Sequence, residues 1–420
     1  MAMSDAIGAM DASAGHQPAA NAATPAERPA TPAAPGGRRV RRLARAAVQA
    51  RARNALLLAI FPVMAAAKLM VAFLLPAKYF YDNNRILKMT LGTAGRNAWD
   101  GSYRVAADMF AGINVAGLGT MMEWSLAMGL LFTFVTIGMV LRADAPDTVQ
   151  CLFTLATVGL LNIYIFTIGK DVIQFVFFLA VYLILVAPVN GQTPKMLLVA
   201  AVLVGESVVF RAYYVLVAAL VLAVYALLQP FRARRDLRLR SVPVIFAALA
   251  AAICVMLLAA SWLMPGEYRR VMALRGMYGA VMEGSADSRT FIGNWVPGDG
   301  LAVFMANYAI NALRMMIPVE LALRGAYYLP FFAFQTMVTV YVVNLLRQIN
   351  RLNEPVLFMA LCVFLGYALA SFVFEPDFGS WTRHEAATFP VLHLLVLNRY
   401  QRMPLTAGER MAYGRPAWAR

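Results

Sequence analysis

Charged residues are scarce in this sequence. Asp, Glu, Lys and Arg make up 14% of the 420 residues, whereas 61% are hydrophobic. A soluble domain usually carries about 25% charged residues, so the composition excludes a soluble fold. Several apolar runs reach the roughly 20 residues that a helix needs to cross the hydrocarbon core. Long alternating polar and apolar strands of the outer-membrane barrel type are missing. The sequence therefore predicts an all-α, polytopic transmembrane helical bundle.

Cysteine and histidine are also rare, with three of each. Cys151, Cys254 and Cys362 all lie in apolar runs, where small buried side chains are expected and a disulfide framework or metal site is not. Walker A, dinucleotide-binding, CxxC and HExxH patterns do not occur. We therefore expect no metal site, no cofactor, and neither ATP-driven nor metalloprotease chemistry.

The N-terminal region, 1–54, contains no apolar run. Residues 1–37 are rich in Ala, Pro, Ser and Gly, a composition typical of disorder. The arginines between Arg38 and Arg53 come directly before the first apolar run, which begins near Ala55. A basic segment held at an anionic inner leaflet explains them better than a nucleic-acid patch, and no cleavable signal peptide is expected.

We expect a transmembrane domain over 55–398, with loops at about 77–120 and 265–326, followed by a basic tail at 399–420. The ten expected spans are about 55–76, 121–141, 149–168, 172–188, 196–210, 213–229, 242–264, 327–346, 356–374 and 386–398. The last is short for a full crossing. An eleventh apolar stretch, 301–318, is interpreted as interfacial or re-entrant, because another span would invert the segments after it.

Positive charge is concentrated in alternate connections. With the N-terminus inside, the cytoplasmic segments carry almost all of the net charge of +15. The positive-inside rule therefore predicts that both termini are cytoplasmic. The opposite, outer face then collects the remaining charged motifs.

The first such motif is the turn Lys170–Asp171, between the third and fourth spans. One interpretation is a tight helical hairpin in which Asp171 favours the start of the next helix. The other is a lysine that holds a phosphate while Asp171 orients a donor. Adjacent residues on a helix do not face each other, so the two need not act as a pair.

Glu206 lies inside the fifth apolar run, and Arg211, Tyr213 and Tyr214 follow at its outer end. A carboxylate at that depth is costly unless it is paired or faces a wet cavity. One interpretation is a buried ion pair of Glu206 with Arg211 or Lys170. The other makes Glu206 a general base and Arg211 a phosphate ligand, since the planar guanidinium binds phosphate oxygens in pairs.

The most specific motif is Glu375–Pro390, which reads EPDFGSWTRHEAATFP and groups five ionisable side chains within eleven residues. His384, between Arg383 and Glu385, can exchange a proton near neutral pH. The alternative is a loop whose charges form only local salt bridges. We favour a functional role, because five such groups exceed what a short connection needs.

These features resemble the Wzy-type polysaccharide polymerases of bacterial inner membranes and, more broadly, GT-C glycosyltransferases that use polyprenyl phosphate sugars. The similarity covers roughly 55–400 and consists of the YFYDNN loop, the KD turn, the RAYY turn, the long outer loop and the final RH pair. In the long loop, Arg289 and Arg314 are each followed after ten residues by a glycine, a spacing found in some polymerases.

The resemblance implies an O-antigen or exopolysaccharide polymerase of the bacterial inner membrane. Such an enzyme transfers glycans from lipid diphosphate-linked donors on the periplasmic face, without a metal. Its partners would be the bilayer, a polyprenyl-linked oligosaccharide and other polysaccharide-assembly proteins, with no nucleic acid. The implied substrate-binding residues are Arg211, Arg383, Lys170, Asp171, Arg289, Arg314 and Tyr214. The implied catalytic residues are His384, Glu206 and Asp82.

Other functions stay open. GT-C enzymes usually have two neighbouring acidic residues in the first outer loop, whereas Asp82 has no adjacent partner. A single-sugar transferase and an O-antigen ligase are the alternatives within the same chemistry. A transporter or lipid flippase, and a scaffold without chemistry, are the alternatives of other classes. A transporter predicts charged side chains near the middle of several spans.

Overall fold

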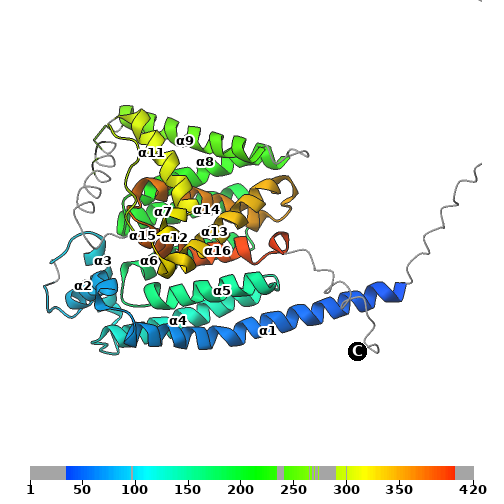
Figure 1. The fold of residues 1–420 in the computed structure, drawn as a ribbon, viewed down its shortest axis with the longest axis horizontal. Coiled ribbons are helices and arrows are strands. Elements are labelled where there is room, and N and C mark those ends of the chain that lie inside the picture. The colour runs from blue at the N-terminus through cyan, green and yellow to red at the C-terminus, as the bar shows by residue number, and fades with distance from the viewer. Residues whose placement is uncertain are drawn as a thin grey trace, which may run out of the picture.

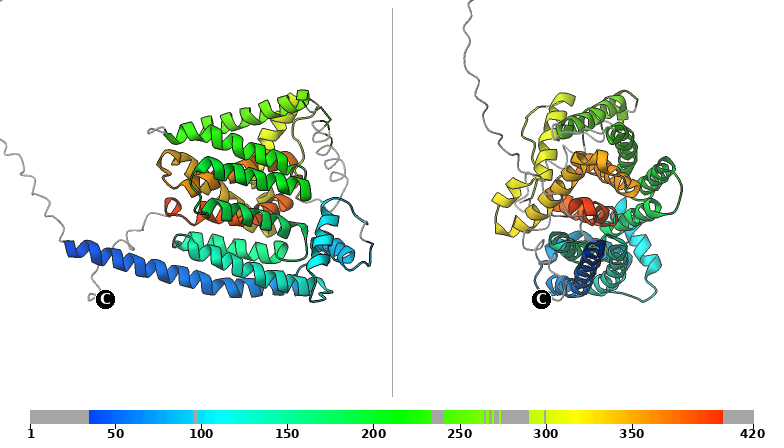
Figure 2. Two further views of the ribbon diagram at one scale, coloured as in Figure 1. Left: turned by 180° about the vertical axis from the view of Figure 1, so that it is seen from behind. Right: turned by 90° about the vertical axis from the view of Figure 1, so that its right-hand side faces the viewer.

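The computed structural model describes residues 35–95, 98–233, 241–263, 265–266, 269, 273, 290–298 and 300–402. Within these ranges most of the chain is helical and no strand is formed, which confirms the expected all-α bundle. The long helices lie side by side and roughly parallel or antiparallel (Figures 1 and 2).

Eight helices are long and apolar enough to cross a membrane, as expected of a multi-pass membrane protein. Seven of these spans each lie wholly or mainly in one helix. The helices are α1 Pro35–Phe73, α4 Met121–Arg142, α7 Gln192–Val209, α8 Tyr214–Ala233, α9 Ser241–Leu263, α13 Leu329–Arg347 and α14 Pro355–Phe374. The eighth span, Thr148–Ile165, combines α5 Thr148–Leu160 with the π-helical turn η2 Leu161–Ile165.

The expected span 172–188 is α6 Lys170–Val186, which has the expected 17 residues. One other expected span is markedly shorter than the sequence pattern indicates. The expected span 386–398 contains α16 Phe389–Val396, whose eight residues extend about 12 Å at 1.5 Å per residue. Because Thr388 and Leu397 lie outside helical geometry, α16 is too short to cross the hydrocarbon core of about 30 Å.

Shorter helices fill the connections. They are η1 Ala77–Phe80, α2 Tyr81–Thr90, α3 Ser102–Ile113, α11 Leu301–Met316, α12 Val319–Leu323, η3 Ala326–Tyr328, η4 Ile349–Arg351, α15 Phe378–Ala387 and η5 Arg399–Gln401. Helices α11 and α12 lie in one half of the bundle (Figure 1).

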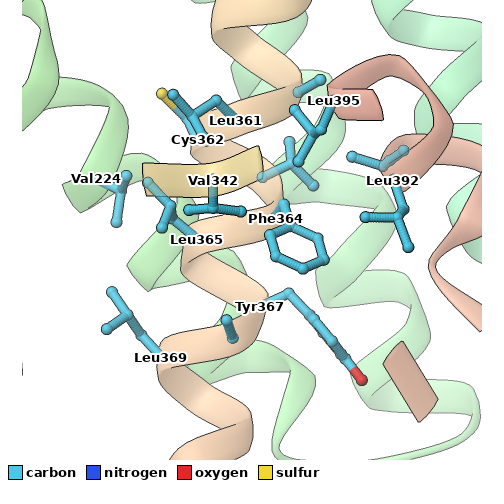
Figure 3. Packing of buried hydrophobic residues seen from close by; sticks show 14 of the residues in the cluster. Val224, Val342, Leu361, Cys362, Phe364, Leu365, Tyr367, Leu369, Leu392 and Leu395 are labelled. Carbon is cyan, nitrogen blue, oxygen red and sulfur yellow. The ribbon is translucent and has the colours of Figure 1, made fainter. Parts of the chain in front are cut away.

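Helix α14 forms the centre of the bundle. In its most apolar window 94% of the residues are buried, whereas no other span exceeds 44%. Side chains of α14, such as Phe364, pack against side chains of α8, α13 and α16, among them Val224, Val342 and Leu392 (Figure 3). At Gly366 the backbone of α14 comes so close to α8 that an added Cβ would lie 2.6 Å from the Val221 nitrogen.

The two ends of the bundle differ in chemistry. We call the end with α2, α3 and α15 the site end, and the opposite end, with Arg232, Arg347 and Arg399, the basic end (Figure 1). Helix α1 has 39 residues and runs past the other helices at the basic end. Its length of about 58 Å is nearly twice what a span needs.

Candidate functional site

Three breaks between helices meet at the site end: the α5–α6 break, the α7–α8 turn and the start of α15. Asp377 is the N-cap of α15, and its Oδ1 accepts a hydrogen bond from the Ser380 backbone nitrogen at 2.8 Å. Such a cap fixes where the helix begins. It therefore also fixes where Arg383 and His384, in the middle of α15, point.

Asp171, in the first turn of α6, is the centre of the cluster. Its Oδ1 lies 3.2 Å from both Arg211 Nη2 and His384 Nε2, and its Oδ2 lies 2.9 Å from Arg383 Nε. The carboxylate is buried, with 9% of its side chain exposed. Burial alone would raise the pKa of Asp171, but the charges of Arg383, His384 and Arg211 outweigh it and hold the pKa well below its usual range.

His384 joins Asp171 to a second carboxylate. Its Nδ1 lies 2.6 Å from Glu375 Oε1, and its Nε2 lies 3.2 Å from Asp171 Oδ1 and 3.3 Å from Arg211 Nη2. An imidazole that donates to both carboxylates is a cation. Burial opposes that charge, yet Glu375 and Asp171 outweigh burial and raise the pKa of His384. Glu375 also accepts a hydrogen bond from Ser380 Oγ at 2.8 Å.

Arg211 is held by neutral groups as well as by Asp171. Its Nη1 donates to Gln174 Oε1 at 3.0 Å and to the Tyr213 hydroxyl at 3.1 Å. Gln174 in turn donates to the backbone oxygen of His384 at 3.0 Å. Arg211 is therefore fixed in place by three protein groups, and α6, α8 and α15 are tied together around it.

Lys170 and Asp82 form a separate ion pair beside this cluster, 2.8 Å apart. Asp82 also accepts a hydrogen bond from the Tyr103 hydroxyl at 2.7 Å. Burial would raise the pKa of Asp82, but Lys170 and Tyr103 lower it. Lys170 and Asp171 thus have different partners, which confirms that adjacent residues at the start of a helix need not act as a pair.

A cavity of about 740 Å³ opens next to the cluster. Arg383 belongs to both: it contacts Asp171 on one side and lines the cavity on the other. The cavity wall also contains the carboxylate of Asp377 and the hydroxyl of Ser380. Four tyrosines form much of the rest, and they are Tyr79, Tyr164, Tyr327 and Tyr328.

Four of the site residues expected from the sequence are brought together in one contact network. These are Asp171, Arg211, Arg383 and His384. Lys170 and Asp82 lie next to it as a pair. Arg289 lies outside the described residues. The remaining three, Glu206, Tyr214 and Arg314, are not part of the network.

Glu206 is fully buried in α7, and the structure corrects one interpretation of it. The expected ion pair with Arg211 or Lys170 does not form, because those cations bind Asp171 and Asp82. Neither Glu206 oxygen has a hydrogen-bond partner, although the buried hydroxyl of Tyr214 is a close neighbour. Tyr214 packs in the core as the neighbour of Tyr213, with ring centroids 5.0 Å apart.

Arg314, on α11, is occupied by other parts of the long loop. It donates to the Gly293 carbonyl at 2.6 Å and to Asn311 Oδ1 at 2.8 Å, and it pairs with Glu320. Glu320 also pairs with Arg324, four residues later in the chain. Arg314 thus joins α11 to α12 and to the preceding segment, and it does not line the cavity.

Other residues of the site have no role in the sequence-based expectations. Gln174 is a polar residue within an apolar run, one helical turn after Asp171, and that spacing could have indicated it. Tyr79, Tyr164 and Tyr327 come from three different helices, and their hydroxyls interact with one another at the cavity. No local pattern in the sequence brings these three together.

The charges of the site are nearly balanced. Arg211, Arg383 and Lys170 lie among the carboxylates of Asp171, Glu375, Asp82 and Asp377, and His384 lies between Asp171 and Glu375. Within the described ranges no three His, Cys, Asp or Glu side chains gather as a metal site would need. The arrangement suits binding of an anion through Arg383, which lines the cavity.

Comparisons of the chain with models of protein families, with characterised proteins and with solved structures give no match in any of the three. The case for a function therefore depends on the geometry of this site and on the sequence motifs that form it.

Proposed function

We propose that this protein is a polysaccharide polymerase that transfers glycans from a lipid diphosphate-linked donor, at the site end of the bundle. The observation that carries the proposal is the position of Arg383. Its guanidinium makes no hydrogen bond with any residue that the structure describes, and its contact with Asp171 is an ion pair through Nε. Donors of this side chain stay available at the cavity wall, where a diphosphate could accept hydrogen bonds.

The other lining residues support a sugar ligand next to that anion. Tyrosine rings offer flat apolar faces and hydroxyls, the combination that suits sugar rings with one apolar face and several hydroxyl groups. Ser380 and Asp377 add a donor and an acceptor in the same wall. The cavity volume of about 740 Å³ lies within the usual 300–1,000 Å³ of ligand sites.

In the proposed reaction the acceptor hydroxyl attacks the anomeric carbon of the donor. The bond from that carbon to the diphosphate oxygen breaks, and the lipid diphosphate leaves with the electron pair. Arg383 stabilises the departing negative charge. Asp377 lines the cavity and receives the hydroxyl proton. We assign it this role in preference to Glu206 and His384, which both lie outside the cavity lining.

The proposal includes the orientation and the compartment. The arginines at the basic end and the positive-inside rule support a cytoplasmic basic end and a site at the outer edge of the inner membrane. A lipid-linked donor carries its phosphates at the membrane surface. A site at the end of the bundle is therefore in reach of them.

The test uses the full-length protein in lipid vesicles with a polyprenyl diphosphate oligosaccharide as donor and acceptor. We expect chain elongation, and we expect Arg383→Ala to lower kcat/KM about 100-fold, as for removal of one charge-stabilising donor. Arg383→Lys, which keeps the charge but loses the planar donors, should recover only part of the loss.

Arg104→Ala is the matched control, because Arg104 is an exposed arginine of the same end that pairs only with Asp100. It should leave elongation unchanged and keep the unfolding temperature of the wild type within a few degrees. Arg383→Ala removes one partner of Asp171, so its kcat/KM is compared with the wild type at a temperature at which both are shown to be folded. Transfer from a polyprenyl monophosphate sugar, with none from the diphosphate donor, would disprove the polymerase. Full activity of Arg383→Ala would disprove the role of Arg383.

A transporter or lipid flippase is the second candidate, and a specific observation favours it. A charged side chain, Lys68, lies inside the span of α1, and its ammonium donates to the backbone oxygens of Asn162 and Phe166 at the end of the neighbouring span. Charged side chains inside spans mark the substrate and ion pathways of transporters. Movement of a labelled lipid-linked sugar across the vesicle membrane, without any elongated product, would establish this function in place of transfer.

A further inference from the structure

The span formed by α5 and η2 stops inside the protein. The turn η2 has π geometry, with the Phe166 nitrogen donating to Leu161 oxygen at 2.7 Å, and the four residues 166–169 then connect to α6 without helical structure. Helix ends leave backbone carbonyls without their usual donors. Where no water is present each such carbonyl needs another partner.

Lys68 supplies that partner from α1. Its Nζ donates to the Asn162 oxygen at 2.7 Å, to the Phe166 oxygen at 2.9 Å and to Ser125 Oγ at 2.9 Å. An ammonium group has three donors, so all three are used. The lysine is buried, with 6% of its surface exposed. A bound monovalent cation would be coordinated by ligands of the same kind, namely two backbone carbonyls and a hydroxyl.

A glycine makes room for this contact. On α4, Gly129 faces the end of Lys68, and an added Cβ would lie 2.4 Å from Lys68 Cε and 2.8 Å from Nζ. Such distances are far below van der Waals contact, so any larger residue would displace the ammonium. Gly129 is thus an independent feature of the same chain that fits the ammonium position.

The carbonyls held by Lys68 lie directly before the functional cluster. Phe166 is followed by Ile168, whose oxygen accepts a hydrogen bond from Asn83 Nδ2 at 2.6 Å, and then by Lys170 and Asp171. Lys68 and Asn83 therefore hold the connecting segment from two sides. The position of the first turn of α6, and with it the Asp171 carboxylate, depends on that segment.

We propose that the break between α5 and α6 is a monovalent-cation site that the chain fills with its own Lys68 ammonium, and that this contact positions Asp171. Lys68 is a positioning residue: it lies outside the cavity lining and acts through the backbone of 166–169. The inference stands whether or not the cluster transfers glycans, because its tests do not use activity.

The first test is amide hydrogen exchange of the full-length protein carrying Lys68→Met, which keeps the length of the side chain and removes the charge. We expect exchange over 166–175 to become at least about tenfold faster, because hydrogen bonds to a charged group are lost. Lys195→Met is the control: Lys195 donates to the Leu185 and Ala187 oxygens at the other end of α6. It should speed exchange there and leave 166–175 unchanged.

Unchanged exchange over 166–175 in Lys68→Met would overturn the proposal. A uniform increase along the whole chain would also overturn it, because Lys68 would then support the fold in general. If Lys68→Met yields no folded protein, Gly129→Ala carries the same test with the same expected outcome, since its Cβ displaces the ammonium.

The second test restores the cation. In Lys68→Ala we expect ethylammonium to raise the unfolding temperature above the value in tetramethylammonium at the same concentration, because only ethylammonium carries N–H donors. The wild-type protein, whose site is filled, should show no such difference. Equal effects of both salts on Lys68→Ala would show that the break is not a cation site.

Discussion

His384 Nδ1 lies 2.6 Å from Glu375 Oε1, and the eight residues between them in the chain form a cap and most of helix α15. The contact holds the polar stretch between these two residues in a fixed conformation. The charged motif that suggests a loop in the sequence is therefore a capped helix. The stability of this helix depends on the charge of the His384 imidazole.

That dependence predicts how stability varies with pH. The pKa of His384 is raised, so its contribution is present below the usual value of 6.5 and is lost as the pH rises through the raised value. The pKa of Glu375 is lowered, because His384 outweighs the effect of burial. Its contribution is therefore present above the usual value of 4.5 and is lost as the pH falls. We expect His384→Gln to lower the free energy of unfolding most at about pH 5.5, by about 1.5–3 kcal/mol, and by less at about pH 9.

Thermal or denaturant unfolding of wild type and His384→Gln in one detergent, at several pH values, measures this difference. Glu354→Gln is the reference, since Glu354 pairs with Arg399 at the exposed surface and should cost under about 1 kcal/mol. A cost for His384→Gln that does not change with pH would show that the ring is not charged in the folded protein.

Asp171→Asn removes the only carboxylate that Arg211, Arg383 and His384 share. Loss of one partner leaves buried charge uncompensated, so we expect the free energy of unfolding to fall by about 3–5 kcal/mol. Denaturant unfolding measures it, and Asp100→Asn, in an exposed pair with Arg104, should change it by less than about 1 kcal/mol. Equal small effects of both changes would contradict the central position of Asp171.

Glu206→Gln tests whether the buried carboxylate of α7 has a chemical role. Neither of its oxygens has a hydrogen-bond partner, so removal of the ionisable group should change the free energy of unfolding by no more than about 0.5 kcal/mol. In our proposal Asp377 is the base, and glycan elongation by Glu206→Gln should match the wild type. Loss of elongation at unchanged stability would return the role of base to Glu206.

Gly366→Ala tests the close approach of α14 and α8. The new Cβ would lie 2.6 Å from Val221 N and 2.7 Å from its Cα, and backbone atoms cannot move aside as a flexible side chain can. We expect a loss of about 3 kcal/mol in the free energy of unfolding. Gly138→Ala, with open space around its Cβ, should be neutral or stabilising by up to about 1 kcal/mol. Similar effects of the two changes would contradict this packing.

Much of the fold follows from the sequence, because the length and apolarity of a run decide whether a helix can span. Most expected spans lie within a few residues of the observed helices. The difference at 386–398 arises because apolar residues there pack in the protein core: His393 and its neighbours in α16 are buried. Apolarity alone does not separate a core helix from a lipid-facing one.

The site was only partly predictable. Asp171, Arg211 and Arg383 each stood out as a charge at the edge of an apolar run, since charge is expensive there. Which charge pairs with which depends on how the helices pack, and that is why an ion pair of Glu206 with Arg211 or Lys170 stayed one of two interpretations. Lys68 has no role in the expectations, because a lone lysine near the end of a span is usually a side chain that reaches for the interface.

The central position of α14 has a consequence for synthesis in the membrane. This helix is made after α8 but is enclosed by it and by α6, α11 and α16, with hardly any surface left for lipid. Until residue 374 has entered the bilayer, the earlier helices lack the central helix against which they pack. A chain that ends before Pro355 would thus lack the helix around which the others pack, and could not act as a smaller working protein.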